Sequence, residues 1–96
     1  MKVRFSGKAR SDLVRAYRYL AERNPVVAEK FMADVDLKLD QLSRFPHIGR
    51  DRSEFVPNLR SILVLTYLLF YAIRDGRIEI VRVIDGRMDI HQELQR

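Results

Sequence analysis

The stretch that decides the fold is Leu59–Ile84, LRSILVLTYLLFYAIRDGRIEIVRVI, which holds most of the aliphatic side chains in the second half of the chain. At its centre is Asp75-Gly76. An Asp-Gly pair between two apolar runs is a strong hairpin signal, because a type I′ turn needs positive φ at both central residues. The sequence therefore predicts an antiparallel hairpin with strands at Tyr67–Arg74 and Arg77–Ile84.

A two-residue turn also predicts which residues lie opposite each other. One face would pair Ile73 with Ile78, Tyr71 with Ile80, Leu69 with Arg82 and Tyr67 with Ile84, and the other Ala72 with Glu79, Phe70 with Val81 and Leu68 with Val83. Both faces are largely apolar, whereas a sheet with one face open to water alternates more cleanly. We therefore expect a cover on each face, and the upstream helices can supply one of them.

A short strand and two helices precede this region. Lys2–Phe5 alternates apolar and charged residues with the period of a strand. Gly7–Arg23 then carries apolar residues at helical spacing. Asn24-Pro25 ends this helix and begins a second one, from Pro25 to about Arg44, because Asn is a good cap and Pro suits the first helical position. So short a break predicts an antiparallel helical hairpin.

Proline residues bound the segment that follows. Phe45-Pro46 ends the second helix, and Pro57 excludes a central strand before it, so we expect residues 47–58 to form a loop. A strand at about Leu59–Leu63 follows, and Met88–Arg96 forms a short terminal helix or a mobile tail. The prediction is one α+β domain over residues 1–96 with the order β-α-α-β-β-β(-α). Its antiparallel sheet packs on the N-terminal helical hairpin, and the first strand lies at an edge.

Composition narrows the class of protein. The chain has no cysteine, which fits a reducing cytoplasm, and its longest apolar run is too short to span a bilayer, so we expect a cytoplasmic protein with no membrane partner. Lysine and arginine number 18 against 13 acidic residues, for a net charge of +5. Residues 1–49 carry ten basic and six acidic side chains, so the excess lies mainly in the first half. This balance favours acidic partners or nucleic acid.

The sequence contains few signs of catalysis. No cysteine, serine elbow or glycine-rich phosphate loop is present, and His47 and His91 have no companion ligands at metal-binding spacing. We therefore expect no metal and no cofactor.

Metal-free RNA cleavage needs only a base, an acid and cations on the phosphate. Candidate cations are Arg60, Arg82 and Arg87, candidate hydroxyls are Tyr67 and Tyr71, and candidate bases are Glu54 and His91. Structural roles compete with each of these. The tyrosines can pack across strands, Glu54 can be loop surface, and Arg82 can pair with a carboxylate such as Glu79 or Asp89.

A series of short motifs, taken in order, resembles the RelE/ParE superfamily of bacterial toxin–antitoxin systems. They are Ala9, Asp12-Leu13 and Tyr17–Leu20 after the opening strand; Asn24-Pro25 and Ala28; Leu42, Phe45-Pro46 and Gly49-Arg50; Leu59-Arg60; Phe70-Tyr71; and Ile80–Ile84 followed by Asp89. The resemblance covers nearly the whole chain and implies the RelE/ParE-like fold.

Within the superfamily, the sequence is more similar to the ParE branch. The segment after the last predicted strand, DGRMDIHQELQR, has Arg87 and His91 but no tyrosine, unlike the basic and aromatic ends of RelE-like nucleases. The resemblance implies a type II toxin that inhibits DNA gyrase without catalysis of its own. The alternatives are a RelE-like ribosome-dependent mRNA endoribonuclease and an interaction module that has lost toxicity.

The resemblance also implies partners and sites. The partner would be a ParD-like antitoxin in a hetero-oligomer, with DNA reached only through the antitoxin. An antitoxin helix would lie along the helical hairpin, and we expect its contacts at Leu13, Tyr17, Leu20, Phe31 and Val35. We expect the toxic surface to contain Arg60, Tyr71, Arg82 and Arg87.

Overall fold

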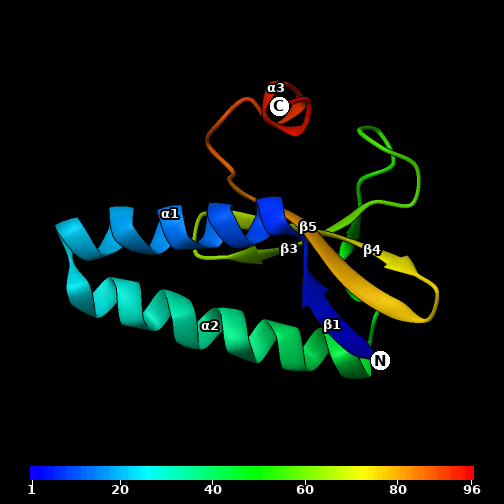
Figure 1. Cartoon of the computed structure of the whole chain (residues 1–96), viewed down its shortest axis with the longest axis horizontal. Helices are drawn as coiled ribbons and strands as arrows, with labels where there is room; N and C mark the ends of the chain where they lie inside the picture. Colours follow the sequence, from blue (N-terminus) through cyan, green and yellow to red (C-terminus); the bar gives the residue numbers. More distant parts are fainter.

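The computed structural model describes all residues from 1 to 96 and places a five-stranded sheet between two sets of helices (Figure 1). The elements are β1 (Lys2–Phe5), α1 (Gly7–Arg23), α2 (Pro25–Arg44), β2 (Arg50–Asp51), β3 (Arg60–Val64), β4 (Tyr67–Arg74), β5 (Arg77–Asp85) and α3 (Ile90–Leu94). The predicted α+β order is confirmed. The short strand β2 lies in the segment predicted as a loop.

Local capping sets the helix boundaries as predicted. The Ser6 hydroxyl accepts a hydrogen bond from the Ala9 N–H at 3.0 Å and so caps α1. The Asn24 side chain accepts from the N–H groups of Val26 and Val27, at 3.1 and 3.3 Å, and caps α2. These bonds satisfy N–H groups that have no partner inside the helix. Since only Asn24 separates them, the two helices run side by side as an antiparallel pair (Figure 1).

The sheet is mixed, which corrects the predicted antiparallel sheet. Its strand order is β1-β5-β4-β3-β2. Strands β2 to β5 pair antiparallel, as expected of a meander, but β1 pairs with β5 in parallel. Only short turns force neighbouring strands to be antiparallel. Since the whole helical hairpin separates β1 from the meander, β1 is free to run in either direction at the sheet edge.

The Asp75-Gly76 turn forms as predicted, with φ of 51° and 71°. Near the turn, the predicted pairs Ile73–Ile78 and Tyr71–Ile80 are present. Beyond them the predicted register is wrong, because a β-bulge between Tyr71 and Phe70 leaves Val81 without a partner and shifts every later pair by one residue. Leu69 thus lies opposite Val83, Phe70 opposite Arg82, Leu68 opposite Ile84 and Tyr67 opposite Asp85. A one-residue shift exchanges the faces of a strand.

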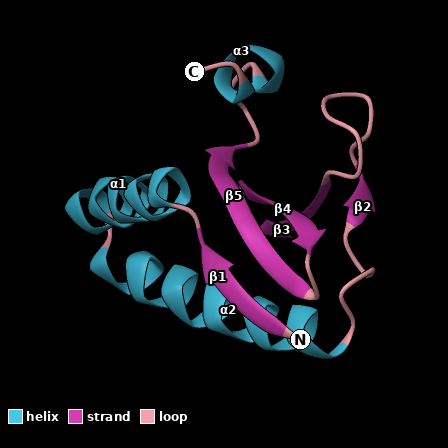
Figure 2. Cartoon of the chain, turned by 45° about the vertical axis from the view of Figure 1, so that its right-hand side comes forward, coloured by secondary structure: helices cyan, strands magenta, loops and turns pink.

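Two apolar clusters cover the two faces of the sheet. The larger lies between the sheet and the helical hairpin, and its buried members include Phe31, Val35, Leu69 and Ile80. The smaller consists of Leu59, Phe70 and Ile84, with Phe55, Leu68, Val81, Ile90 and Leu94 packed against it. The second face is therefore covered by α3 and by the loop that contains Phe55. Figure 2 shows α3 beyond the end of β5, apart from α1 and α2.

None of the three helices combines the length and apolar composition that crossing a membrane requires.

The hairpin turn provides a first testable prediction. Replacing Gly76 by Ala should lower the free energy of unfolding by about 1 kcal/mol, because a Cβ is strained at positive φ. The matched control is Gly7→Ala, since a Cβ at Gly7 meets nothing within 4 Å and that residue is helical. It should leave stability unchanged or raise it. Urea unfolding measures both, and equal effects would contradict the role of the turn.

Candidate functional site

A buried ion pair lies where α1 crosses the bulge of β5. Arg82 Nε donates to Asp12 Oδ2 at 2.7 Å, and Arg82 Nη2 reaches Asp12 Oδ1 at 3.4 Å. The same carboxylate accepts the Val83 N–H at 3.0 Å. Both side chains are nearly inaccessible, at 10% and 4% exposure. Asp12 thus neutralises the arginine and also satisfies a backbone donor next to the bulge.

The N-terminus of α1 satisfies the remaining backbone groups of the bulge. Ser6 N–H donates to the Ile80 carbonyl at 2.9 Å, and the Ser6 hydroxyl donates to the Val81 carbonyl at 3.1 Å. Arg82 also ties down the C-terminal segment, because its Nη1 donates to the Glu93 carbonyl at 2.5 Å. Through these bonds a single stretch, residues 80–83, connects β5 to α1 and α3.

A cleft of about 470 Å³ opens beside this ion pair, between α1, the end of β5 and the approach to α3. Its lining is partly aromatic and partly charged and consists of Asp12, Arg15, Ala16, Tyr19, Tyr67, Arg82, Val83, Ile84, Asp85, Arg87, Met88 and Glu93. Arg87 Nη2 lies 2.6 Å from Asp85 Oδ2, and this hydrogen bond lowers the pKa of the Asp85 carboxyl. Burial, together with the Asp85 charge, raises the pKa of Tyr67. The cleft is therefore suited to binding a partner side chain.

Arg60 and Tyr71 lie elsewhere, under the segment that leads into β2. The Tyr71 hydroxyl donates to the Pro46 carbonyl at 2.8 Å and accepts the Gly49 N–H at 2.9 Å. Arg60 Nη1 donates to the carbonyls of His47 and Gly49, at 3.3 and 2.8 Å. A Cβ on Gly49 would collide with the Tyr71 ring, so only glycine fits there. Both side chains hold this loop against the sheet.

The four residues expected on one toxic surface are thus divided between two places. Arg82 and Arg87 line the cleft, whereas Arg60 borders a separate hollow beside β2. Arg82 is itself buried, because it pairs with Asp12, so its expected exposure on a surface is wrong. Tyr71 is fully buried, and burial raises its pKa, so its expected place on a surface is wrong. The reason is that it points into the larger core, on the same face as Ile80.

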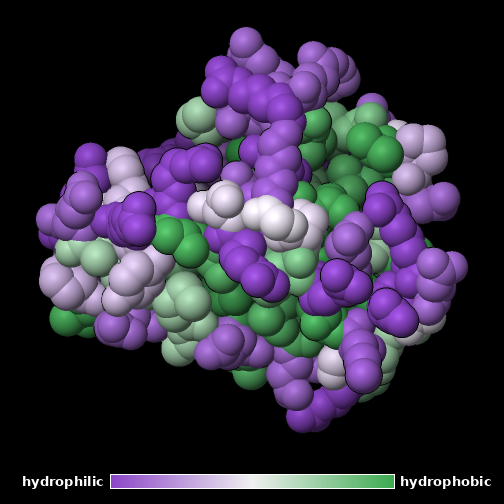
Figure 3. Space-filling model, in the orientation of Figure 1, coloured by the Kyte–Doolittle hydropathy of each residue, from purple (hydrophilic) through white to green (hydrophobic).

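The five residues expected to contact an antitoxin fall into a buried group and a half-buried group. Phe31 and Val35 are fully buried in the larger core, so the expectation that a partner touches them is wrong. Leu13, Tyr17 and Leu20 are half-buried, and the two leucines pack at the edge of the same core. Figure 3 shows hydrophobic surface around the junction of α1, α2 and β1. The Tyr17 hydroxyl donates to Glu29 on α2 at 3.1 Å.

Sequence reasoning missed Asp12 as the partner of Arg82. The carboxylates considered for that role were Glu79 and Asp89, but Glu79 pairs with Arg74 at 2.8 Å and Asp89 caps α3. The available signal was the position of Asp12 on the buried stripe of α1, between Ala9 and Ala16. A carboxylate on such a stripe needs a buried cation, because an unpaired buried charge is costly.

The groups considered for RNA cleavage are brought together only in part, since Tyr67, Arg82 and Arg87 line the cleft but Arg60, Tyr71, Glu54 and His91 do not. Arg82 and Tyr71 are held inside the protein, and the His91 ring lies 5.8 Å from the Phe55 ring. Glu54 is 3.5 Å from Arg52 in the loop before β3. The cleft beside Arg82 holds neither Glu54 nor His91.

Residues 3–90 match the family described as the ParE toxin of the type II toxin–antitoxin system parDE. The chain belongs to the ParE toxin family. It is 36% identical to Toxin ParE3 of Caulobacter vibrioides over 84 residues, which cover 86% of this chain and 84% of that protein. It is also 32% identical to Toxin ParE1 of Mycobacterium tuberculosis over 68 residues, covering 70% of this chain and 69% of that protein.

A solved structure shows the same fold. The chain matches a structure titled "Chromosomal ParDE TA system from P. aeruginosa" with a TM-score of 0.74 and 22% identity, over 88% of this chain and 95% of that chain. The expected RelE/ParE-like fold is therefore confirmed, and so is the ParE branch within the superfamily. The family match over residues 3–90 includes both Asp12 and Arg82, the two partners of the buried ion pair.

The ion pair supplies the second prediction. Asp12→Ala should destabilise the protein by about 3–5 kcal/mol, because it leaves the Arg82 charge buried and unpaired. The control is Asp40→Ala, which breaks the exposed Arg44–Asp40 pair, 2.7 Å long, and should have little effect. Urea unfolding measures both.

A double variant distinguishes loss of the pair from a defect of packing. Asp12→Leu together with Arg82→Met removes both charges and should cost less than Asp12→Ala alone. If Asp12→Ala destabilised the chain no more than Asp40→Ala, the buried ion pair would not be needed for stability.

Proposed function

We propose that this chain inhibits DNA gyrase by binding it and that a ParD-like antitoxin neutralises it by covering the helical hairpin. Membership of the ParE family is the observation that carries the proposal. The geometry supports a binding role over RNA cleavage. The arginine and tyrosine that would serve best in cleavage, Arg82 and Tyr71, are each held by two or more internal hydrogen bonds.

The cleft beside Arg82 is the surface we assign to the target. It combines exposed apolar groups, Tyr19 and Met88, at 43% and 51% exposure, with the cation Arg87. Aromatic anchors flanked by arginine are the residues that most often carry binding energy at protein interfaces. Arg87 is the best of these to test, since its side chain is 68% exposed and its loss disturbs no core contact.

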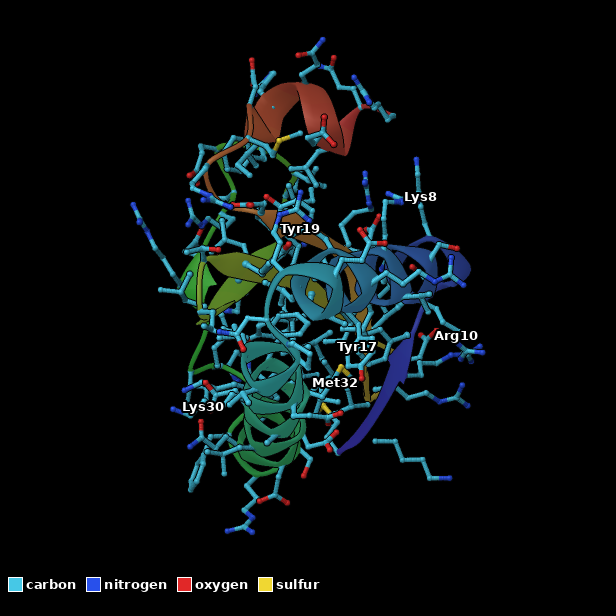
Figure 4. The ribbon with its side chains drawn as sticks, turned by 90° about the vertical axis from the view of Figure 1, so that its left-hand side faces the viewer. Lys8, Arg10, Tyr17, Tyr19, Lys30 and Met32 are labelled. Atoms are coloured by element: carbon cyan, nitrogen blue, oxygen red, sulfur yellow. The ribbon has the colours of Figure 1, made fainter.

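The band between α1 and α2 is the surface we assign to the antitoxin. Leu13, Tyr17 and Leu20 are half-buried there, and an amphipathic helix can lay its apolar face along such an apolar strip. The two proposed surfaces lie on opposite sides of α1. Figure 4 shows this arrangement through Tyr17 and Tyr19, which project from opposite sides of the helix.

The gyrase proposal makes the third prediction. The purified chain should block supercoiling of relaxed plasmid by gyrase, and Arg87→Ala should weaken that inhibition by about tenfold, a loss of about 1.4 kcal/mol. Arg77→Ala, at the exposed tip of the hairpin, is the matched control and should inhibit like the native chain. Unimpaired gyrase, together with ribosome-dependent cutting of mRNA, would reject the proposal in favour of the RelE-like alternative.

The antitoxin surface makes the fourth prediction. Tyr17→Ala should weaken binding of a ParD-like antitoxin by about tenfold, because it removes an aromatic side chain from the proposed contact surface. Tyr19→Ala is the control, with the same substitution two residues away on the opposite side of α1. Isothermal titration measures both affinities, and melting curves check that both variants fold. A larger loss with Tyr19→Ala would place the antitoxin on the other side of the helix.

A further inference from the structure

The outer face of α1 forms a trough that lies apart from the buried ion pair and from the proposed antitoxin surface, and that shares only Arg15 with the cleft. Three small residues lie along it, namely Gly7, Ser11 and Val14. A hollow of about 350 Å³ over them is bordered by Arg10, Arg15 and Arg18. We call these six residues the basic trough. Lys8 lies beside it and lines the adjoining hollow with Arg15. The two acidic residues of that hollow are each paired, Asp12 with Arg82 and Glu93 with Arg96. In Figure 4, Lys8 and Arg10 project from α1 away from the body of the protein.

The positive charge of the trough is not balanced by its own helix. Helix α1 contains two acidic residues, Asp12 and Glu22. Asp12 is buried and bound to Arg82, although Arg15 Nη1 approaches its outer oxygen at 3.6 Å. Glu22 lies one residue from the end of the helix, far from Lys8. The Arg15 side chain remains 75% exposed and free to reach a ligand. The face therefore presents four cations to solvent within three turns of helix.

The occupant of this surface has to be an anion rather than an apolar protein segment. Val14 is the only hydrophobic residue in the trough. Protein interfaces obtain most of their affinity from buried aromatic and aliphatic anchors, which the trough does not offer. Affinity for nucleic acid comes chiefly from arginine and lysine contacts to phosphates, which it offers in number.

The shape of the trough favours duplex DNA over RNA. Lys8 to Arg18 spans about 15 Å along the helix. Helical spacing places Arg10 on one side of the line of small residues, Lys8 and Arg15 on the other, and Arg18 at the end of the line. A helix with this arrangement can approach the major groove of B-DNA, which is about 12 Å wide, and reach phosphates on either side. The major groove of an RNA duplex is deep and too narrow for side chains to enter.

We infer that the basic trough of α1 binds the phosphate backbone of duplex DNA directly, without sequence preference. This differs from the expectation drawn from the family resemblance, in which DNA is reached only through the antitoxin. The contact is independent of the gyrase proposal, because it needs only this chain and DNA. A measurement of DNA binding by the purified chain, without gyrase, therefore tests it.

The test is fluorescence anisotropy of a labelled 20-base-pair duplex titrated with the purified chain at several salt concentrations. The native chain should bind with a dissociation constant of about 1–100 µM. With four phosphate contacts, the slope of log affinity against log salt should be about −3.6. Arg10→Gln, Arg15→Gln and Arg18→Gln combined should reduce that slope to about −1 and weaken binding by about a hundredfold.

A matched variant controls for net charge. Lys30→Gln, Arg50→Gln and Arg77→Gln remove the same charge from exposed positions on α2, β2 and the hairpin tip. This variant should bind DNA within about threefold of the native chain. Melting curves and circular dichroism confirm that both triple variants fold.

Four results would overturn the inference. The first is no binding of the duplex by the native chain at low salt. The second is equal weakening by the two triple variants, which would indicate net charge rather than the trough. The third is tighter binding of an RNA duplex of the same length, which would assign the trough to RNA. The fourth is that the triple variant of Arg10, Arg15 and Arg18 loses antitoxin binding and keeps DNA binding, which would assign the trough to an acidic peptide.

Discussion

The buried pair of Asp12 and Arg82 is the interaction on which the rest of the structure depends. It forms at the one place where the regular pairing of β4 and β5 breaks, and the carboxylate satisfies both the guanidinium and the Val83 N–H. A buried ion pair is often no more stabilising than apolar packing. Its value here is positional, since it fixes α1, the bulge and α3 with respect to one another.

The bulge determines what each face of the sheet presents. Without it, Arg82 and Ile84 would follow Ile78 and Ile80 on the face under the helices. With it, Val83 joins the larger core and Ile84 joins the smaller cluster beneath α3. The C-terminal helix can pack there because the extra residue turns an apolar side chain toward it. One inserted residue therefore provides both the cover of the second face and the cleft at the end of β5.

The helix α1 serves several purposes at once because its sides differ. One side is buried through Ala9, Asp12 and Ala16. One flank carries the half-buried Leu13, Tyr17 and Leu20, and the other borders the cleft. The outer side carries the basic trough. The cleft and the basic trough adjoin each other on this helix, and Arg15 lines both of them. The alternation of charged and apolar residues along Gly7–Arg23 is what makes this division possible.

The sequence by itself determined the two long helices with their ends and the hairpin turn, because local rules govern them. Ser6 and Asn24 cap the helices, Pro25 begins α2, and Asp75-Gly76 sets the turn, each through contacts within a few residues. The family motifs likewise predicted the fold. Only the tertiary structure decided the bulge at Val81, the parallel pairing of β1, the burial of Tyr71, Phe31 and Val35, and the choice of Asp12 as partner for Arg82. Those outcomes depend on contacts between residues far apart in the chain, such as 12 and 82, whose geometry no local pattern specifies.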